Sequence, residues 1–262
     1  MTARLYDAHV HLADLRLRPH QSEIGKAYHR INLGKAVVVG TGPHDWPLVL
    51  EQCATNPRFL PAIGLHPWQV PHATADWQES FLAAFKAGAR AVGEIGLDRW
   101  IEGHDLAKQI PVFEFQLHFA AENNLPASLH ALKATGVLMD ILRTAALPAR
   151  GFHLHAYSGP LELIEELTSL GAYFSFNGGQ LHRPAAQARL LTIPADRLLI
   201  ETDAPDFIPQ AAYREYELKV AGEALCHPAN LDAAYRAIAE LRKCPLAELA
   251  LTVEANFKRF FL

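Results

Sequence analysis

The 262-residue chain has three cysteines, Cys53, Cys226 and Cys244, and none belongs to a Cys-x-x-Cys arrangement. An odd number of widely separated thiols argues against a disulfide framework and against a thiolate zinc site, because both require paired or clustered sulfur atoms. We therefore expect ordinary reduced thiols and look for the chemistry of this chain in other residue types.

The chain also lacks a long uncharged apolar run and an N-terminal apolar segment with basic flanks. Those are the signatures of a membrane span and a signal peptide, so the sequence predicts a cytoplasmic protein without a membrane partner. The formal net charge is −4, which disfavours a long nonspecific nucleic-acid surface because such binding uses many Lys and Arg contacts with phosphates. The net charge does not exclude a local basic patch. The sequence shows no sign of an obligate protein partner.

Apolar runs alternate with amphipathic segments along most of the chain. Eight runs are predicted strands, at residues 5–12, 35–40, 59–65, 89–98, 126–130, 151–159, 172–179 and 198–205. Their count and spacing predict an α/β fold, a (β/α)8 TIM barrel, as a single domain over residues 1–262. A doubly wound open sheet is the alternative, but its Gly-x-Gly-x-x-Gly turn is absent. We expect residues 205–228 to form an active-site loop, and helices at 231–241 and 246–261 to cover the barrel.

Histidine is abundant, with fourteen residues, and many of them lie at the ends of predicted strands. His9 and His11 are separated by one residue, so in a regular strand they point to the same face, while Ala8 and Val10 point to the opposite layer. Two imidazole nitrogens placed in this way suit a transition-metal ion. A pair of hydrogen-bonded strand histidines is the alternative, since His-x-His alone is a weak motif.

Glu94 is a charged residue inside an apolar strand and is flanked by glycines. Burial of a carboxylate is costly unless a cation compensates it, either a metal or a buried Arg or Lys. We favour a metal, because no predicted strand supplies an obvious basic partner. Asp98 follows the same strand, either as a hydrogen-bonding group behind a ligand or as the cap of the next segment.

In a barrel of this kind the carboxyl ends of the strands converge on one mouth. Six residues with nitrogen or oxygen ligand atoms would then line one pocket: His9, His11, Glu94, His130, His155 and Asp203. Six ligands exceed the need of one tetrahedral ion, and the two oxygens of Glu94 can bridge two ions. His153 shares a face with His155, and one of this pair is expected to be structural.

As a set, the sequence motifs resemble the TatD family of metal-dependent deoxyribonucleases, within the amidohydrolase-like barrels. The matching segments are Asp7–Leu12, Gly64–Pro67, Gly93–Asp98, Leu125–His130, His155–Gly159, Glu201–Pro205 and Asn256–Phe260. The resemblance implies a metal-dependent hydrolase of phosphodiester bonds, with 3′-to-5′ DNA exonuclease as the best-known activity. It places the metal ligands on the same six residues and implies divalent metal ions, two of them, from Mg, Mn or Zn. The substrate would be DNA or a small phosphodiester.

The resemblance also suggests roles for individual residues. Asp203 would orient a water and take its proton, while Glu94 would join the two metals. His66 would bind a phosphate, together with Lys133; for His66, a loop histidine that caps a turn beside Pro67 is an equal alternative.

Two segments depart from the family pattern. The family usually follows its strand-five histidine with Ser-Arg, where this chain has Ala131 and Leu132, and then Lys133. It commonly carries Arg-Asn before a proline in the last loop, where this chain has Cys226 and His227. The expected metal ligands are thus present, whereas the residues expected to meet the substrate are altered.

The sequence is compatible with two other functions. One is a small-molecule amidohydrolase or lactonase on the same barrel, whose relatives often bridge their metals with a carboxylated lysine; the carboxylate of Glu94 favours the phosphodiesterase. The other is a metal-containing binding protein without activity, which loss of Glu94 or Asp203 would support, yet both residues are present.

Overall fold

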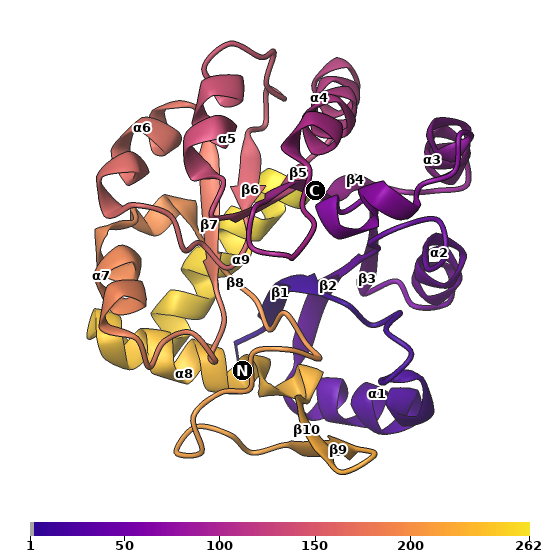
Figure 1. Ribbon diagram of the computed structural model, residues 1–262. Helices are drawn as coiled ribbons and strands as arrows, with labels where there is room; N and C mark the ends of the chain where they lie inside the picture. The colour runs from indigo at the N-terminus through magenta and orange to yellow at the C-terminus, as the bar shows by residue number, and fades with distance from the viewer. Residues whose placement is uncertain (1–2) are drawn as a thin grey trace.

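The computed structural model describes residues 3–262 and shows a barrel of eight strands surrounded by helices (Figure 1). Each strand pairs in parallel with the next along the chain, in the order β1 to β8. The strands are β1 Leu5–Val10, β2 Leu33–Val39, β3 Phe59–Ile63, β4 Ala91–Asp98, β5 Ala127–Leu132, β6 Phe152–Leu154, β7 Ala172–Phe176 and β8 Leu198–Ile200. The predicted (β/α)8 barrel is confirmed.

The last strand meets the first just beyond β8. The backbone N–H of Asp203 donates to the carbonyl of His9, and that of His11 donates to the carbonyl of Ala204. The Asp7 carboxylate strengthens this junction, because it accepts from the backbone N–H and the hydroxyl of Thr202. The barrel therefore closes at its carboxyl end, next to three of the predicted ligands, His9, His11 and Asp203.

Helices follow the strands and cover the outside of the barrel. They are α1 Gln21–Arg30, α2 Trp46–Thr55, α3 Trp77–Lys86, α4 Leu106–Glu122, α5 Thr135–Leu142, α6 Ile164–Ser169, α7 Pro184–Thr192, α8 Leu231–Arg242 and α9 Leu246–Phe261. Short 3-10 turns add η1 Arg18–His20, η2 Pro67–His72, η3 Leu161–Leu163, η4 Ala195–Arg197 and η5 Pro228–Asn230. The regularly repeated β/α unit puts all connections that follow a strand at one end of the barrel.

The core has two parts. The larger lies between the strands and the surrounding helices, and the smaller lies inside the barrel, where Tyr6 and Tyr173 meet Phe257, Phe260 and Phe261 of α9. Helix α9 passes behind the barrel in Figure 1 and contacts β1 and β8. The aromatic rings of α9 thus fill the end opposite the strand carboxyl ends, which leaves the other end for polar side chains.

Two local predictions were wrong. Ala8 packs with the inner cluster while Val10 belongs to the outer core, because the pairing of β1 is irregular between Asp7 and Val10, so simple alternation does not hold. The predicted loop 205–228 contains a two-stranded antiparallel hairpin, β9 Glu217–Val220 and β10 Glu223–Cys226. Within residues 3–262, no helix has the length and apolar character needed to cross a bilayer.

Candidate metal centre

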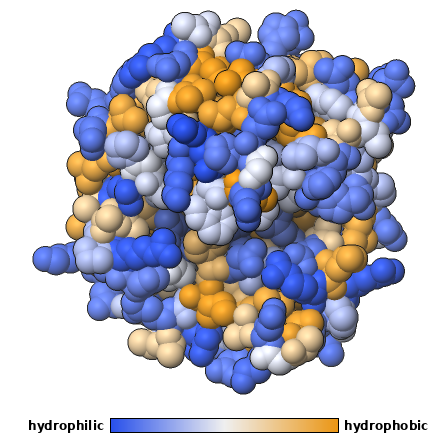
Figure 2. Space-filling view, viewed as in Figure 1, coloured by the Kyte–Doolittle hydropathy of each residue, from blue (hydrophilic) through white to orange (hydrophobic). Residues whose placement is uncertain are grey.

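The six predicted ligands come together at the carboxyl ends of the strands. His9 lies near the end of β1, Glu94 lies within β4, and His130 lies near the end of β5. His11 and His155 directly follow β1 and β6, and Asp203 lies a short distance beyond the end of β8 at Ile200. Seen from this side, the surface of the molecule is hollowed near its centre (Figure 2). His9, Glu94 and Asp203 are buried, and His11, His130 and His155 are partly accessible.

The two carboxylate oxygens of Glu94 face different histidines. Oε2 lies 3.4 Å from Nε2 of His9 and 3.5 Å from Nε2 of His11. Oε1 lies 2.9 Å from Nδ1 of His130 and 2.8 Å from Nε2 of His155. One side chain therefore joins two adjacent groups of nitrogen donors.

Asp203 completes the first group. Its Oδ1 lies 3.8 Å from Nε2 of His9 and 3.4 Å from Nε2 of His11, and those two nitrogens are 3.1 Å apart. Donor atoms bound tetrahedrally to one ion at about 2.1 Å would stand roughly 3.4 Å from one another. The spacing of these nitrogen and oxygen atoms matches that of ligands around a single cation.

The hydrogen-bond partners of His11 show that this group needs a positive charge. Nδ1 of His11 lies 3.2 Å from the Val39 carbonyl, which can only accept, so Nδ1 carries the hydrogen and Nε2 of the neutral ring presents a lone pair. That lone pair faces Nε2 of His9 and the oxygens of Glu94 and Asp203. A cluster of acceptors is stable when a metal cation or bound protons lie between them, so the residues fit a divalent cation.

The same requirement holds on the other side of Glu94. Nε2 of His130 lies 2.8 Å from Oδ2 of Asp98 and donates to it, which turns the Nδ1 lone pair toward Glu94. Nδ1 of His155 is buried and has no hydrogen-bond partner within the described chain. Its nearest carboxylates are Asp203 Oδ2 at 3.8 Å and Glu201 Oε1 at 4.0 Å. This second group also fits a cation, with His130 and His155 as its nitrogen donors.

The pKa values of these residues also indicate that the cluster needs positive charge. Burial alone would lower the pKa of His11 and of His155, but the nearby carboxylates raise them to about 9 and about 10. Burial would raise the pKa of Glu94, but the charges of His155 and His66 and the histidine hydrogen bonds hold it well below its usual value. In the absence of a cation, protons on these imidazoles balance the carboxylates.

The family comparison agrees with this geometry. The family model described as TatD-related DNase matches residues 6–262. The chain belongs to this family. Together with its relatives, this membership makes the protein a TatD-family metal-dependent hydrolase.

Relatives and solved structures cover almost the whole chain. A 3′-5′ ssDNA/RNA exonuclease TatD from Citrobacter koseri is 32% identical, over 98% of each chain. An uncharacterised metal-dependent hydrolase, YabD of Bacillus subtilis, is 29% identical, again over 98% of each. The crystal structure of the TatD homologue YjjV from Escherichia coli superposes with a TM-score of 0.88 at 25% identity, covering 100% of this chain and 99% of that one.

The two residues predicted to bind phosphate in this TatD-family chain have different surroundings. Nδ1 of His66 accepts from the backbone N–H of Trp68, so the turn-capping role is present, and Nε2 points to Glu94 Oε1 at 3.2 Å. His66 thus reaches the cluster of candidate ligands directly. Lys133 is exposed just after β5, and its ammonium group has no hydrogen bond or ion pair with residues 3–262.

The structure accounts for the other departure from the family pattern. Nδ1 of His227 accepts from the backbone N–H of Ala229 and caps η5. An asparagine side chain makes the same kind of bond at a helix N-terminus. His227 therefore does the capping that the family's asparagine would do, while Cys226 is buried and carries no charge to the site.

The sequence prediction missed the polar side chains directly beneath the cluster. Glu201 is buried, its Oε1 accepts from the backbone N–H of Ala156, and its Oε2 accepts from Ser175. His153 bonds to Ser175 and Ser128 and is the structural member of its pair. Glu201 carried a usable signal, because it is a carboxylate directly after the apolar run of β8.

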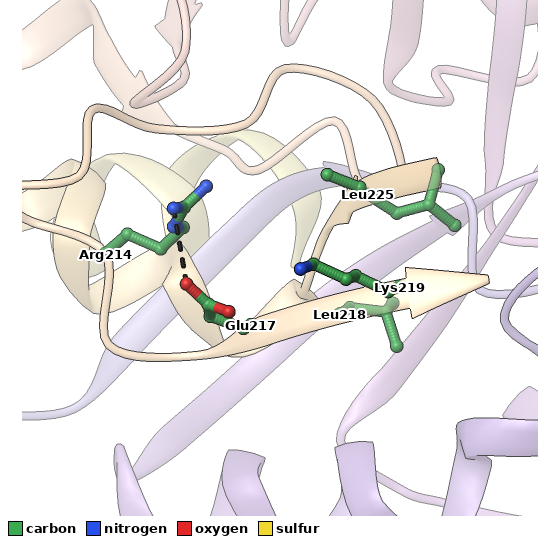
Figure 3. A pocket seen from close by; sticks show the side chains of 6 residues that line it. Arg214, Glu217, Leu218, Lys219 and Leu225 are labelled. Carbon is green, nitrogen blue, oxygen red and sulfur yellow. Dashed lines mark hydrogen bonds and ion pairs between the residues drawn. The ribbon is translucent and has the colours of Figure 1, made fainter. Parts of the chain in front are cut away.

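A shallow pocket on the β9–β10 hairpin is separate from this centre (Figure 3). It is lined by Arg214, Glu217, Leu218, Lys219, Ala224 and Leu225, and Arg214 pairs with Glu217 across 3.4 Å. None of the candidate ligands lines it, so the hairpin contributes no donor atom to the candidate metal centre.

Proposed function

We propose that the protein hydrolyses phosphodiester bonds with two divalent cations from Mg, Mn or Zn, as a 3′-to-5′ exonuclease on single-stranded DNA. The observation that carries the proposal is the division of the Glu94 oxygens between two groups of histidines. Paired cations suit the in-line displacement at phosphorus, where both the attacking and the leaving oxygen carry charge. Relatives named as 3′-5′ ssDNA/RNA exonucleases support the choice of substrate.

In the proposed arrangement, His9, His11 and Asp203 would hold one cation and His130 and His155 would hold the other, and the carboxylate of Glu94 faces both groups. When bound, the pair of cations supplies electrophilic activation of a water and of the phosphoryl oxygens. The imidazoles must be neutral for this role, so the protons that balance the carboxylates leave when the cations bind.

Asp203 is the base in this proposal. Its Oδ1 faces His9 and His11, whereas its Oδ2 lies 3.8 Å from Nδ1 of His155, beyond hydrogen-bond distance. Oδ2 is therefore able to accept a hydrogen bond from a water and then its proton. Asp203 is buried, so the carboxylate is held in one position.

The residues around Glu94 argue against the alternative function of an amidohydrolase or lactonase. Every ion-pair partner of Glu94 in residues 3–262 is a histidine: His9, His11, His66, His130 and His155. No lysine stands where a carboxylated side chain would bridge two metals, and Glu94 takes that place. The similarity to dihydroorotase, at 13% identity and a TM-score of 0.63, shows the shared fold alone.

The test uses chelator-treated protein reloaded separately with Mg, Mn or Zn. We expect a single-stranded oligonucleotide labelled at its 5′ end to give a descending ladder, and one with 3′-terminal phosphorothioate linkages to resist. The same preparations are assayed on lactones and amides. Cleavage of those substrates without any cleavage of DNA would refute the proposal in favour of the amidohydrolase, and metal binding without hydrolysis would favour a binding protein.

A further inference from the structure

Two tryptophans lie exposed beside the candidate metal centre. The side chain of Trp68 is 39% accessible and that of Trp100 is 57% accessible. Their ring centroids are 6.5 Å apart, with an interplanar angle of 31°. The Trp68 ring is 5.2 Å from the His66 ring and 6.4 Å from the His130 ring, so the pair borders residues that contact Glu94.

Asp98 holds both tryptophans. Its Oδ2 accepts from Nε1 of Trp68 at 2.8 Å, and its Oδ1 accepts from the backbone N–H of Trp100 at 2.6 Å. Trp68 is also tied by its backbone N–H to His66. The position of Trp68 is therefore set before any ligand binds, and Trp100 is anchored at its backbone while most of its ring faces solvent.

Two unpaired basic side chains stand beside this pair. Arg99 precedes Trp100, and its backbone N–H bonds to the carbonyl of Leu132, which places it next to Lys133. Both side chains are exposed, and neither charged group has a hydrogen bond or ion pair within the part of the chain that the structure describes. Positive charge is thus available near the position where Leu132 stands.

We infer that Trp68 and Trp100 form a stacking site for a base of single-stranded nucleic acid, with Arg99 and Lys133 contacting its phosphates. Exposed indoles beside unpaired cations are the combination that binds single strands, since every base has a face to stack and every linkage has a charge. The position beside the cluster assigns the site to a nucleotide adjacent to the bond that is cut. This inference rests on the proposed function for the location of that bond, but the binding of a base is a separate measurement.

The experiment measures binding to metal-free, full-length protein, so that no hydrolysis occurs. The probes are a fluorescein-labelled oligothymidylate of eight nucleotides and a backbone of equal length that carries no bases. We expect the oligothymidylate to bind more tightly than the abasic strand and to quench tryptophan fluorescence. Trp100→Ala should weaken binding of the oligothymidylate by about five- to 150-fold, the range for loss of one stacked base, and leave the abasic strand unaffected.

Matched variants separate stacking from charge and from folding. Trp100→Phe should restore most of the affinity, because phenylalanine retains an aromatic face. The control Leu251→Ala removes an exposed apolar side chain in a different element, α9, and should not change the affinity for either probe. Replacing Arg99 and Lys133 together by alanine should weaken both probes to the same extent and flatten the salt dependence.

Several outcomes would overturn the inference. They are equal affinity for the two probes, an unchanged affinity in Trp100→Ala, or a concentration-dependent dimer that Trp100→Ala abolishes, which would assign the tryptophans to contact between two copies. A protein that binds bases through Trp100 but cuts no DNA would keep this site and refute the proposed function. If Trp100→Ala cuts DNA as well as the wild-type protein does, the proposed function is kept and the stacking site is refuted.

Discussion

Asp98 accepts a hydrogen bond from Nε2 of His130 across 2.8 Å, and this bond turns the other ring nitrogen of His130 toward Glu94. A carboxylate behind a histidine ligand sets the tautomer of the ring and raises its basicity. Here the same carboxylate also holds Trp68. One residue thus links the orientation of a predicted metal ligand to the aromatic surface beside it.

Replacing Asp98 by asparagine should therefore weaken metal binding without removing a ligand. The amide of Asp98→Asn accepts with one atom where the carboxylate accepts with two, so His130 is held less firmly. We expect the metal affinity to fall about 10- to 100-fold, measured by titrating metal into protein from which a chelator has removed bound ions. Asp105→Asn, which changes the exposed cap of α4 to another good capping residue, serves as the control and should bind metal normally. Equal affinity in the two variants would exclude this role for Asp98.

Glu94→Gln tests the bridge between the two groups of histidines. The amide keeps the size of the side chain but removes the negative charge that both groups share, and its nitrogen cannot accept. We expect elemental analysis to give two metal equivalents in the wild-type protein and one or fewer in the variant, with loss of turnover. Two retained equivalents would show that Glu94 does not join the sites.

Asp203→Asn tests the proposed base. Asparagine retains one neutral oxygen for metal binding but cannot take a proton from water, so turnover should fall about 100-fold or more while much of the metal is kept. Asp206→Asn, on the same loop and exposed, is the matched control. Near-normal turnover of Asp203→Asn would remove this residue from the reaction.

Leu132→Arg tests whether the departure from the family pattern after His130 weakens the binding of DNA. The arginine that the family resemblance expects at this position would add a charge-assisted phosphate contact of about 1.5–3 kcal/mol. The ratio of single-stranded DNA cleavage to cleavage of bis-p-nitrophenyl phosphate should therefore rise. If the wild-type protein already degrades DNA efficiently and the ratio stays constant, Lys133 or the 205–228 segment holds the phosphate.

We expect His227 to make the folded state less stable at low pH. Burial lowers its pKa from the usual 6.5 to about 4, and its Nε2 has no partner among residues 3–262. Between these two values the unfolded chain binds a proton that the folded chain does not, so this residue makes the folded state less stable as the pH falls from 6.5 to 4. The loss amounts to about 1–3 kcal/mol.

His227→Asn should keep the N-terminal cap of η5 and remove the loss of stability that His227 causes at low pH. In urea unfolding of metal-free protein, His227→Asn should lose less stability than the wild type between pH 7 and pH 5. His118→Asn, an exposed change on α4, should behave as the wild type. An identical pH dependence for all three proteins would rule out the contribution of His227.

The sequence determined the repeated unit and the residue types at the mouth of the barrel. Buried parallel strands read as continuous apolar runs, so the eight strands were visible as such runs, and Glu94 stood out as a charge within one of them. The motifs around His9, His130 and Asp203 determined the family resemblance, which the match over residues 6–262 confirms.

Tertiary structure decided how those residues are used. Which oxygen of Glu94 faces which histidine depends on side-chain rotamers and on the register of strands distant in sequence, and neither is encoded in local periodicity. The irregular pairing after Asp7 separated Ala8 from Val10 for the same reason. The contact between Trp68 and Trp100 likewise arises because the barrel brings the ends of β3 and β4 together around Asp98.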